Sequence, residues 1–388
     1  MRRLRSVELF SGAGGLAMGL ESAGFRHRAM IEFNLEAYKT LTSNLKSFYS
    51  SSRNTEILHQ DVREVNYDRF SSVDVVAGGP PCQPFSLGGK AKGYKDTRDM
   101  FPEAVRAVRE LQPKAFIFEN VKGLLRPGFS SYFNYILLQL TYPFEKIRSC
   151  ETWEQHLSRL ERIHTAASYM GLSYRVVFRL LDAADYGIPQ HRFRVFIVGF
   201  RSDLGVEWNF PKKTHSYDSL IYSQWIKKDY WEKHKVAKKS IPNPSEYCYS
   251  RISFLKESGY IPILAPYKTI RDAISDLPDP RAKDKEYPNH DFRTGARPYP
   301  GHSGSSYDEP SKALKAGAHG VPGGENMIAY SDGTYRYFTV REAARIQTFP
   351  DKYIFDGSWT EAMRQIGNAV PVKLAEIVGK SVSDQLLH

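Results

Sequence analysis

The stretch SVELFSGAGGLAMGLESAGF, residues 6–25, reads as a short apolar strand, a glycine-rich turn and the start of a helix. The turn satisfies the pattern G-x-G-x-x-G/A through Gly12, Gly14, Gly15 and Ala17. Glu32 stands 20 residues after Gly12, at the end of the next predicted strand, where Rossmann-like folds place an acid that binds ribose hydroxyls. The pattern alone fits NAD, FAD or S-adenosyl-L-methionine (AdoMet), and Phe10 beside the turn favours AdoMet, which has no pyrophosphate.

Around this stretch, residues 1–200 alternate between strand-like and helix-like segments. Apolar residues in the predicted helices recur at spacings of three and four, as a face packed on a sheet requires. Such alternation implies βαβ units and a mostly parallel sheet, so we expect an α/β fold with helices on both faces. The predicted strands cover residues 6–11, 27–33, 73–78, 114–120, 174–181 and 192–200, and the predicted helices cover 16–24, 34–45 and 101–111.

The composition and the periodicity of the sequence change at about residue 201. Segment 201–335 is rich in Pro, Gly, Ser, Tyr and Lys and shows little periodicity. Regular structure is expected to return over 338–349 and in a last helix over 372–387. We therefore expect a first domain of residues 1–200 completed by 360–388, a smaller irregular domain over 201–335, and a connecting segment over 336–359.

The charge balance points toward a polyanion, most simply nucleic acid. The 388 residues include 54 Lys and Arg against 43 Asp and Glu, which gives a formal net charge of +11. Segment 210–240 holds eight Lys and three acidic residues, interleaved with two Trp and three Tyr. Such a stretch can follow a phosphate backbone, but it can equally be a solvated helix with a few core aromatics.

Several classes of protein are disfavoured by the composition. No 18-residue apolar run occurs, so no membrane span is expected, and the start lacks the apolar stretch of a signal peptide. The three cysteines include no C-x-x-C pair, which argues against a disulfide framework or a zinc site. We expect a soluble, cytoplasmic protein without a metal.

The loop GGPPCQPFS, residues 78–86, follows a short apolar strand and encloses Cys82 between prolines. Its three prolines fix φ and remove backbone donors, so the segment is a stiff loop at a strand end. Ligands of open α/β sheets bind beyond the carboxyl ends of the strands. The glycine turn, Glu32, Asp61 and Cys82 are therefore expected along one edge of the sheet.

A carboxyl group and two arginines follow at later strand ends. Glu119 comes after the apolar run AFIF, where desolvation favours the protonated form, and Arg192 and Arg194 have the i, i+2 spacing of one strand face. A thiolate adding at C6 of a pyrimidine makes C5 nucleophilic, while a carboxylic acid at N3 and an arginine at O2 stabilise the ring charge. Each residue alone has an ordinary structural role, but their joint placement favours this chemistry.

In chain order, these motifs resemble those of the DNA cytosine-5 methyltransferase family of the prokaryotic restriction–modification type. The resemblance covers nearly the whole chain and implies a Rossmann-like AdoMet-dependent methyltransferase sheet. It makes 1–200 with 360–388 the AdoMet-binding catalytic domain and 201–335 the target-recognition domain. The motifs are LFSGAGG (9–15), GGPPCQPFS (78–86), FENV (118–121), QHRFR (190–194), RYFTVREAARIQTFP (336–350) and QIGNAVP (365–371).

The resemblance also implies roles for single residues. Cys82 is then the nucleophile, Glu119 contacts N3 of a flipped-out cytosine, and Arg194 lies at its O2 with Arg192 supporting the loop. The residues implied at AdoMet are Phe10, Gly12, Ala13, Gly15, Glu32, Phe33, Asp61, Val62, Pro81, Met100, Asn368 and Val370.

The expected function is methyl transfer from AdoMet to cytosine C5 in a specific duplex DNA sequence, protecting host DNA in a restriction–modification system. A tRNA cytosine-5 methyltransferase is the alternative, and the long 201–335 segment favours DNA. A nicotinamide oxidoreductase would explain the glycine turn but neither GGPPCQPFS nor GNAVP, and a catalytically silent DNA-binding relative would not need Cys82.

The expected partner is double-stranded DNA, bound by a monomer that is nucleoid-associated and needs no contact with a cognate restriction endonuclease. The target sequence cannot be read from the motifs. Candidates for phosphate contacts are Lys228, Lys235 and Lys238, and candidates for guanine contacts are Arg271, Arg281, Arg293 and Arg297.

Overall fold

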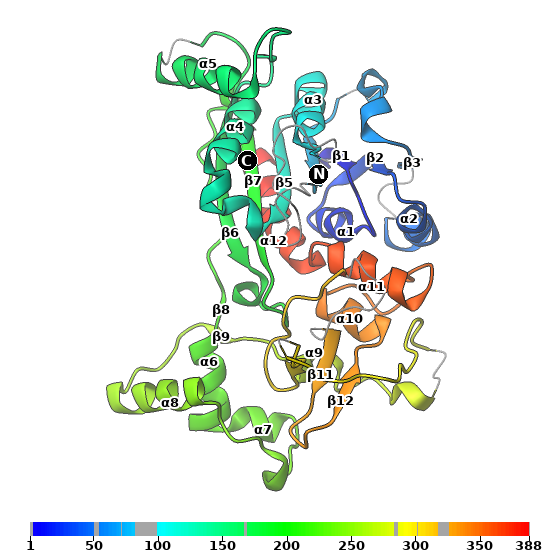
Figure 1. The fold of residues 1–388 in the computed structure, drawn as a ribbon, viewed down its shortest axis with the longest axis vertical. Coiled ribbons are helices and arrows are strands. Elements are labelled where there is room, and N and C mark those ends of the chain that lie inside the picture. The colour runs from blue at the N-terminus through cyan, green and yellow to red at the C-terminus, as the bar shows by residue number, and fades with distance from the viewer. Residues whose placement is uncertain are drawn as a thin grey trace. The chain divides into compact units, whose positions relative to one another are not determined.

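A computed structural model describes residues 3–49, 54–70, 72–81, 99–166, 169–282, 286–300, 302–316 and 326–387 (Figure 1). Packing divides the chain into two compact units. The first unit comprises Met1–Leu181, Phe193–Pro211 and Ala375–His388, and the second comprises Asp182–Arg192 and Lys212–Leu374.

The first unit is built on a seven-stranded sheet with the strand order β3-β2-β1-β4-β5-β7-β6. Its β1, β2, β3, β4 and β5 pair in parallel, whereas β7 runs antiparallel to β5. The expected mostly parallel α/β sheet is therefore confirmed. The strands are β1 (Arg5–Leu9), β2 (Arg26–Glu32), β3 (Glu56–His59), β4 (Val75–Gly78), β5 (Ala115–Val121), β6 (Tyr174–Asp182) and β7 (Phe193–Arg201).

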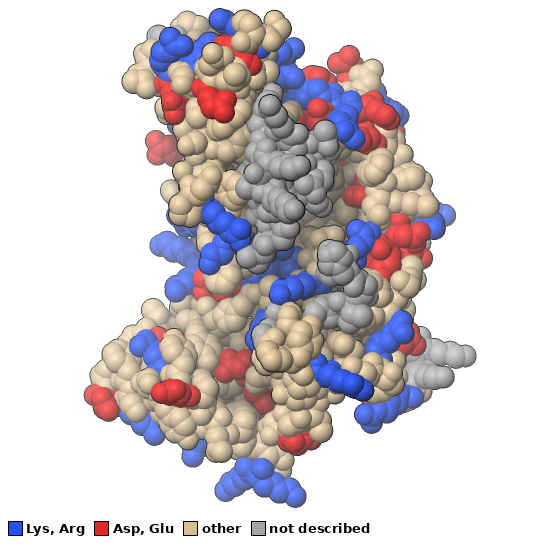
Figure 2. All heavy atoms as spheres, in the orientation of Figure 1, with Lys and Arg blue, Asp and Glu red and all other residues tan. Residues whose placement is uncertain are grey.

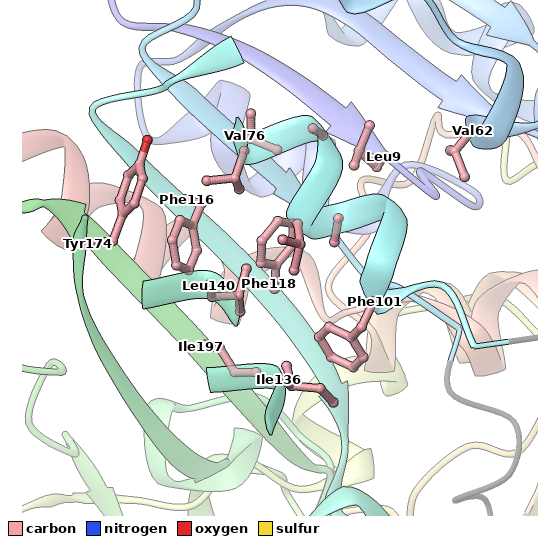
Figure 3. Packing of buried hydrophobic residues seen from close by; sticks show 14 of the residues in the cluster. Leu9, Val62, Val76, Phe101, Phe116, Phe118, Ile136, Leu140, Tyr174 and Ile197 are labelled. Carbon is pink, nitrogen blue, oxygen red and sulfur yellow. The ribbon is translucent and has the colours of Figure 1, made fainter. Parts of the chain in front are cut away.

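Helices cover both faces of this sheet, as expected. On one face, Leu9, Val76 and Phe118 of the strands pack with Phe101 and Ile136 of two helices in a continuous apolar core (Figure 3). On the other face α12 packs against α1, where a side-chain Cβ on Gly379 would come within 2.7 Å of Leu20. The helices are α1 (Gly15–Ser22), α2 (Leu35–Phe48), α3 (Phe101–Leu111), α4 (Ser130–Thr141), α5 (Trp153–Ala166) and α12 (Val372–Leu387).

The second unit consists of short elements joined by long irregular segments. Its strands form a three-stranded sheet, β10-β11-β12, and a two-stranded sheet, β8-β9. The strands are β8 (His215–Ser216), β9 (Ala265–Pro266), β10 (Ser305–Ser306), β11 (Met327–Ala329) and β12 (Tyr335–Tyr337). The helices are α6 (Tyr217–Ile221), the π-helix η9 (Tyr222–Lys227), α7 (Asp229–Lys233), α8 (Glu246–Ser258), α9 (Ile270–Ile274), α10 (Val340–Ile346) and α11 (Trp359–Asn368).

Short 3-10 turns complete both units. In the first unit they are η1 (Val62–Glu64), η2 (Tyr67–Arg69), η5 (Lys122–Leu125), η6 (Pro127–Phe129) and η8 (Ser202–Leu204). In the second unit they are η7 (Ala183–Tyr186), η10 (Lys238–Ser240) and η11 (Pro280–Ala282).

The two units differ in their bounds from the domains expected from the sequence. Residues 182–192, expected in the first domain, pack in the second unit because the buried Gln190 binds Gln347 at 3.1 Å and the amide of Leu314 at 2.9 Å. Residues 336–374 also belong to the second unit. There Thr339 and Glu342 form a capping box at the start of α10. The functional roles of the expected ranges stay a prediction.

The segment RYFTVREAARIQTFP, residues 336–350, stabilises the second unit through the hydrogen bonds and the ion pair of its arginines. Arg341 is fully buried and donates to the carbonyls of Pro288 and Pro350 and to that of Tyr353. Arg336 makes a two-pronged ion pair with Glu342, at 2.7 Å for each contact. These arginines satisfy backbone acceptors and a buried carboxylate, so they hold α10 in the second unit.

Within the described part of the chain, no helix has the length and the apolar character needed to cross a membrane.

Candidate active site

The sheet register brings most of the predicted site residues of the first unit to one edge. Leu9 of β1 lies opposite Ile31 of β2 and Gly78 of β4, and Gly78 lies opposite Phe118 of β5. The residues that follow these positions are Phe10, Glu32, Gly79 and Glu119, all at the carboxyl ends of their strands. Strand order reverses beside β1 and β4, the position where open α/β sheets form their ligand crevice.

The glycine turn is fixed by Glu32. One carboxylate oxygen accepts from the amide of Gly12 at 2.7 Å, and the other accepts from the amide of Asn34 at 2.6 Å. Positive φ angles of 55° at Phe10 and 54° at Gly12 fold the backbone over the end of β1. Glu32 therefore orients the turn through two charge-assisted hydrogen bonds and remains at the strand end where a ribose would lie.

The ends of β2 and β3 supply groups that fit the adenosine part of AdoMet. The Phe33 side chain is 71% exposed and offers a ring face for an adenine. Asp61 caps η1 and pairs with Arg63, whose hydrogen bond lowers the pKa of this carboxyl. An ionised carboxylate has room for further donors beside Arg63. Val62 is buried beneath this edge.

A second acid lies beneath the turn. Glu8 of β1 is fully buried, and neither of its carboxyl oxygens has a hydrogen-bond partner among the described residues. Burial raises the pKa of Glu8 well above its ordinary value. The negative charge of Glu32 also raises the pKa of Glu8.

Cys82 lies outside the described residues, but the backbone that leads to it is visible. A Cβ on Gly78 would lie 2.5 Å from the Leu9 carbonyl oxygen, and one on Gly79 would lie 3.3 Å from Oε2 of Glu119. The two glycines thus allow β4 to pass closely between β1 and the Glu119 carboxyl. Pro81 accepts from the amide of Met100 at 3.2 Å, so the two predicted cofactor residues on either side of segment 82–98 are joined directly.

Asn120 fixes the same backbone from β5. Its side-chain amide donates to the Pro80 carbonyl at 2.9 Å, and its side-chain oxygen accepts from the Val121 amide at 2.9 Å. Both contacts are buried or partly buried, and Pro80 stands two residues before Cys82. Sequence reasoning assigned no role to Asn120, although its position in the FENV motif was the available signal.

Glu119 and Arg194 form a close ion pair. Nε of Arg194 lies 2.5 Å from Oε1 of Glu119, and Nη1 of Arg194 also donates to the Phe193 carbonyl at 2.9 Å. Glu119 is 7% exposed. Burial lowers the pKa of Arg194, and the Glu119 carboxylate opposes that shift. The expected protonated form of Glu119 stays a prediction.

Arg192 does not share the environment of Arg194. It precedes β7, is 1% exposed, and donates to the carbonyls of Leu314 at 3.0 Å, Gly367 at 2.6 Å and Ala369 at 2.9 Å. Its guanidinium therefore acts on backbone acceptors of the second unit, which fits the expected supporting role. The expectation that both arginines share one strand face is wrong, because β7 begins only at Phe193.

The remaining predicted cofactor residues are placed as follows. Ala13 and Gly15 are buried in the turn at the start of α1. Asn368 is the exposed last residue of α11, and Val370 is buried two residues later, both in the second unit. Among the described residues, no group of three His, Cys, Asp or Glu side chains is arranged to hold a metal ion.

The chain is similar to known proteins over nearly its whole length. A family model described as C-5 cytosine-specific DNA methylase matches residues 4–142 and 154–384. The chain is 33% identical over 384 residues to the Type II methyltransferase M.Eco47II of Escherichia coli, covering 97% of this chain and 78% of that protein. It is 30% identical over 387 residues to M.NgoMIV of Neisseria gonorrhoeae, covering 97% and 96%. The solved structure of the S. pombe Dnmt2 methyltransferase has the same fold, with a TM-score of 0.56, 17% identity and 99% of each chain covered.

Proposed function

Because this chain belongs to the C-5 cytosine-specific DNA methylase family, we propose that Cys82, Glu119 and Arg194 perform its reaction on cytosine. The chain is a DNA (cytosine-5-)-methyltransferase that uses AdoMet. The observation that supports these residue roles is the buried Glu119–Arg194 pair, 2.5 Å apart, beside the backbone that leads to Cys82. A duplex hides C5 and C6 of its cytosines, so the target base must leave the helix to reach these groups.

The proposed division of labour follows from the chemistry of the ring. The Cys82 thiolate adds to C6, and the electron pair of the C5–C6 bond becomes available at C5. Glu119 holds N3 by a hydrogen bond, and Arg194 stabilises the negative charge that grows at O2. After C5 has gained a methyl group, a base removes the C5 proton and the thiolate leaves C6. Arg194 thus has two tasks, since it also orients the Glu119 carboxyl.

AdoMet supplies the methyl group when it is bound. We propose that Glu32 accepts from the ribose hydroxyls, Phe33 stacks on the adenine, and Asp61 accepts from the adenine amino group. The turn of Phe10, Gly12, Ala13 and Gly15 would provide backbone contacts, and Val62, Pro81 and Met100 would provide apolar ones. Asn368 and Val370 stay predictions from the motif QIGNAVP.

We further propose that the region of residues 201–335 reads the DNA sequence and that the enzyme acts as a monomer. Its relatives M.Eco47II and M.NgoMIV are named Type II methyltransferases, so a protective role against a Type II restriction endonuclease is the proposed purpose here. Such protection requires only modified DNA, and no contact with the endonuclease is needed.

Methyl incorporation from labelled AdoMet into duplex DNA and into tRNA tests the proposed function. The wild type is expected to label DNA and not tRNA, and Cys82→Ser is expected to bind the same DNA without transferring a methyl group. Cys150→Ser is the matched control, because Cys150 is an exposed free thiol in the same unit. Strong residual transfer by Cys82→Ser would disprove the role of this thiol.

A duplex with 5-fluorocytosine at the target position separates addition from turnover. Fluorine at C5 prevents proton loss, so an enzyme that has added at C6 remains covalently attached. The wild type and Cys150→Ser are expected to form an adduct that survives denaturing electrophoresis, and Cys82→Ser is expected to form none. Bisulfite sequencing of DNA from expressing cells then gives the methylated sequence.

A further inference from the structure

The α7 end of the second unit, comprising η9, α7 and the turn to η10, carries a group of lysines that the proposed active site does not use. Residues 226–240 contain six lysines and two acidic residues. Blue lysine and arginine atoms gather at the lower edge of Figure 2, where Figure 1 shows α7 and the turn that follows it. The exposed lysines of this end are Lys227, Lys228, Lys233, Lys235, Lys238 and Lys239.

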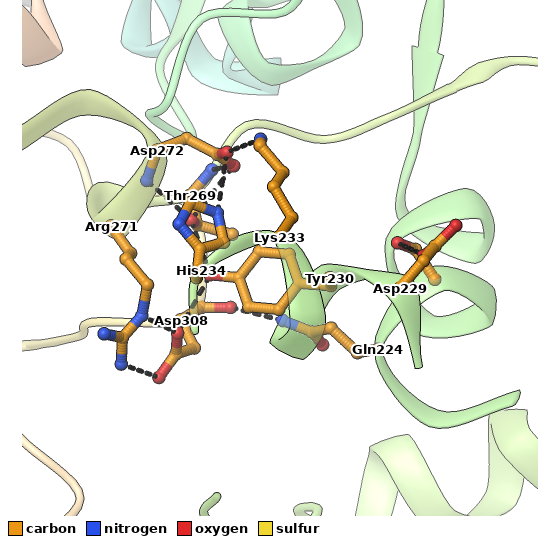
Figure 4. Close-up of polar contacts among 10 residues, drawn as sticks. Gln224, Asp229, Tyr230, Lys233, His234, Thr269, Arg271, Asp272 and Asp308 are labelled. Carbon is orange, nitrogen blue, oxygen red and sulfur yellow. Dashed lines mark hydrogen bonds and ion pairs between the residues drawn. The ribbon is translucent and has the colours of Figure 1, made fainter. Parts of the chain in front are cut away.

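The base beneath these lysines is fixed by a buried polar network (Figure 4). Tyr230 of α7 donates to Asp308 at 2.9 Å, and Asp308 also forms a two-pronged ion pair with Arg271 at 2.6 and 3.1 Å. Gln224 donates to the Asp308 carbonyl at 2.7 Å and accepts from the Trp231 indole at its own carbonyl at 2.6 Å. In this network Nε and Nη2 of Arg271, a candidate for guanine contact, bind Asp308, and the candidate role stays a prediction.

The acidic neighbours neutralise only two of the six lysines. Asp229 pairs with Lys227 at 2.9 Å, and Asp272 pairs with Lys233 at 2.5 Å and with His234 at 3.0 Å. Lys228, Lys235, Lys238 and Lys239 are exposed and have no ion pair among the described residues. Glu232 is the one acidic residue of the segment left exposed without such a pair in the described chain. The α7 end therefore carries a net positive charge.

The backbone is unusual at two of these lysines. Lys228 and Lys235 have φ angles of 66° and 50°, in the left-handed region that side chains other than Asn and Asp rarely occupy. Lys228 ends the π-helix η9, and Lys235 follows the end of α7, so these conformations terminate two helices and hold both lysines at the turns of the α7 end.

We propose that Lys228, Lys235, Lys238 and Lys239 bind the phosphate backbone of duplex DNA and add affinity without reading sequence. Amide, guanidinium and carboxylate groups bind base edges in a fixed geometry, and lysine can do so at guanine. At this end Gln224 is 2% exposed and Asp272 binds the ring of His234, so Glu232 is the one exposed, unpaired carboxylate among the described residues of segment 226–240. The four unpaired ammonium groups outnumber it, and exposed ammonium groups match phosphates as point charges. This inference rests on the proposed function, in that it assumes a DNA substrate.

The test compares the four-fold variant K228Q/K235Q/K238Q/K239Q with the wild type in DNA-binding titrations at several salt concentrations. Each lost phosphate contact reduces the slope of log K against log salt by about 0.9, so the variant is expected to have a slope smaller by roughly 3–4. Between about 50 and 200 mM salt, the wild type is then expected to lose about a hundredfold more affinity than the variant. A four-fold Lys→Arg variant is expected to keep the wild-type slope.

Two DNA duplexes and one control protein make the result decisive. In the α7-end variant, affinity for a duplex that contains the target site and affinity for a duplex of scrambled sequence are expected to fall by the same factor, because phosphates are present in both. K39Q/K46Q/K146Q/K380Q removes the same charge from exposed positions of the first unit and is expected to keep the slope. An unchanged slope in the α7-end variant, or a loss confined to the site duplex, overturns the inference. Failure of the wild type to methylate any duplex would instead contradict the proposed function.

Discussion

Nε of Arg194 lies 2.5 Å from Oε1 of Glu119, and both side chains are largely buried at the ends of two antiparallel strands. Arg194→Met leaves the Glu119 carboxyl buried without this positive charge, so the free energy of unfolding should fall by about 3–5 kcal/mol. Urea unfolding measures this free energy. The double variant E119L/R194M should recover most of the loss, because it removes both charges. A double variant as unstable as the sum of the single ones would contradict the coupling.

Asn120→Asp tests how the backbone before Cys82 is held. Aspartate has the size of asparagine but cannot donate to the Pro80 carbonyl, so the loop should lose its position while the fold is retained. We expect kcat to fall on the order of 10- to 100-fold, with the KM for DNA and AdoMet nearly unchanged. Asn134→Asp is the control, because its amide binds Glu161 at the surface of α4, far along the chain from Pro80. Equal kcat values for the two variants would show that Asn120 does not position the nucleophile.

Arg192→Lys separates a supporting role from a catalytic one. A lysine ammonium cannot match the fork with which Arg192 reaches three carbonyls, so the backbone around residues 314 and 367–369 should loosen. Hydrogen–deuterium exchange should become faster in peptides covering 312–316 and 365–371 and stay unchanged over β1 to β5. Arg201→Lys, at the far end of β7, should leave both peptides as in the wild type. Unchanged exchange in the Arg192 variant would refute its supporting role.

The sheet and the positions of Glu32, Gly79 and Glu119 follow from local sequence. Short apolar runs mark the buried strands, and parallel pairing brings their carboxyl ends to one edge whatever the details of packing. The amide of Gly12, which binds Glu32, is only 20 residues away in the sequence. The antiparallel register of β5 and β7 places Arg194 opposite Val121, two residues after Glu119. These features are either local or imposed by topology, so the sequence predicts them.

The partners of Arg192 and Arg271 could not be predicted in this way. Arg192 binds carbonyls 122 to 177 residues further along, and Arg271 binds Asp308 at a distance of 37 residues. Every residue has a backbone carbonyl, so the sequence does not indicate which carbonyls an arginine will bind. The sequence also does not distinguish a buried arginine from an exposed one. The α8 helix was also missed, because it buries only Cys248, Ile252 and Leu255 and has no continuous apolar stripe.

Glu309 in the second unit should make stability depend on pH. Burial raises its pKa to about 7 against the hydrogen bond from Tyr217, whose hydroxyl lies 3.1 Å from Oε1. The folded state therefore holds a proton that the unfolded state releases near pH 4.5, so this contribution to stability is complete below that pH and is lost as pH rises to about 7.

Glu309→Gln keeps an acceptor for Tyr217 but does not titrate. Its stability relative to wild type should rise by about 3 kcal/mol between about pH 4.5 and 7.5, measured by urea unfolding. Glu257→Gln, at an exposed position near the end of α8, should follow the wild-type curve, and a parallel curve for Glu309→Gln would mean that Glu309 is ionised in the folded protein.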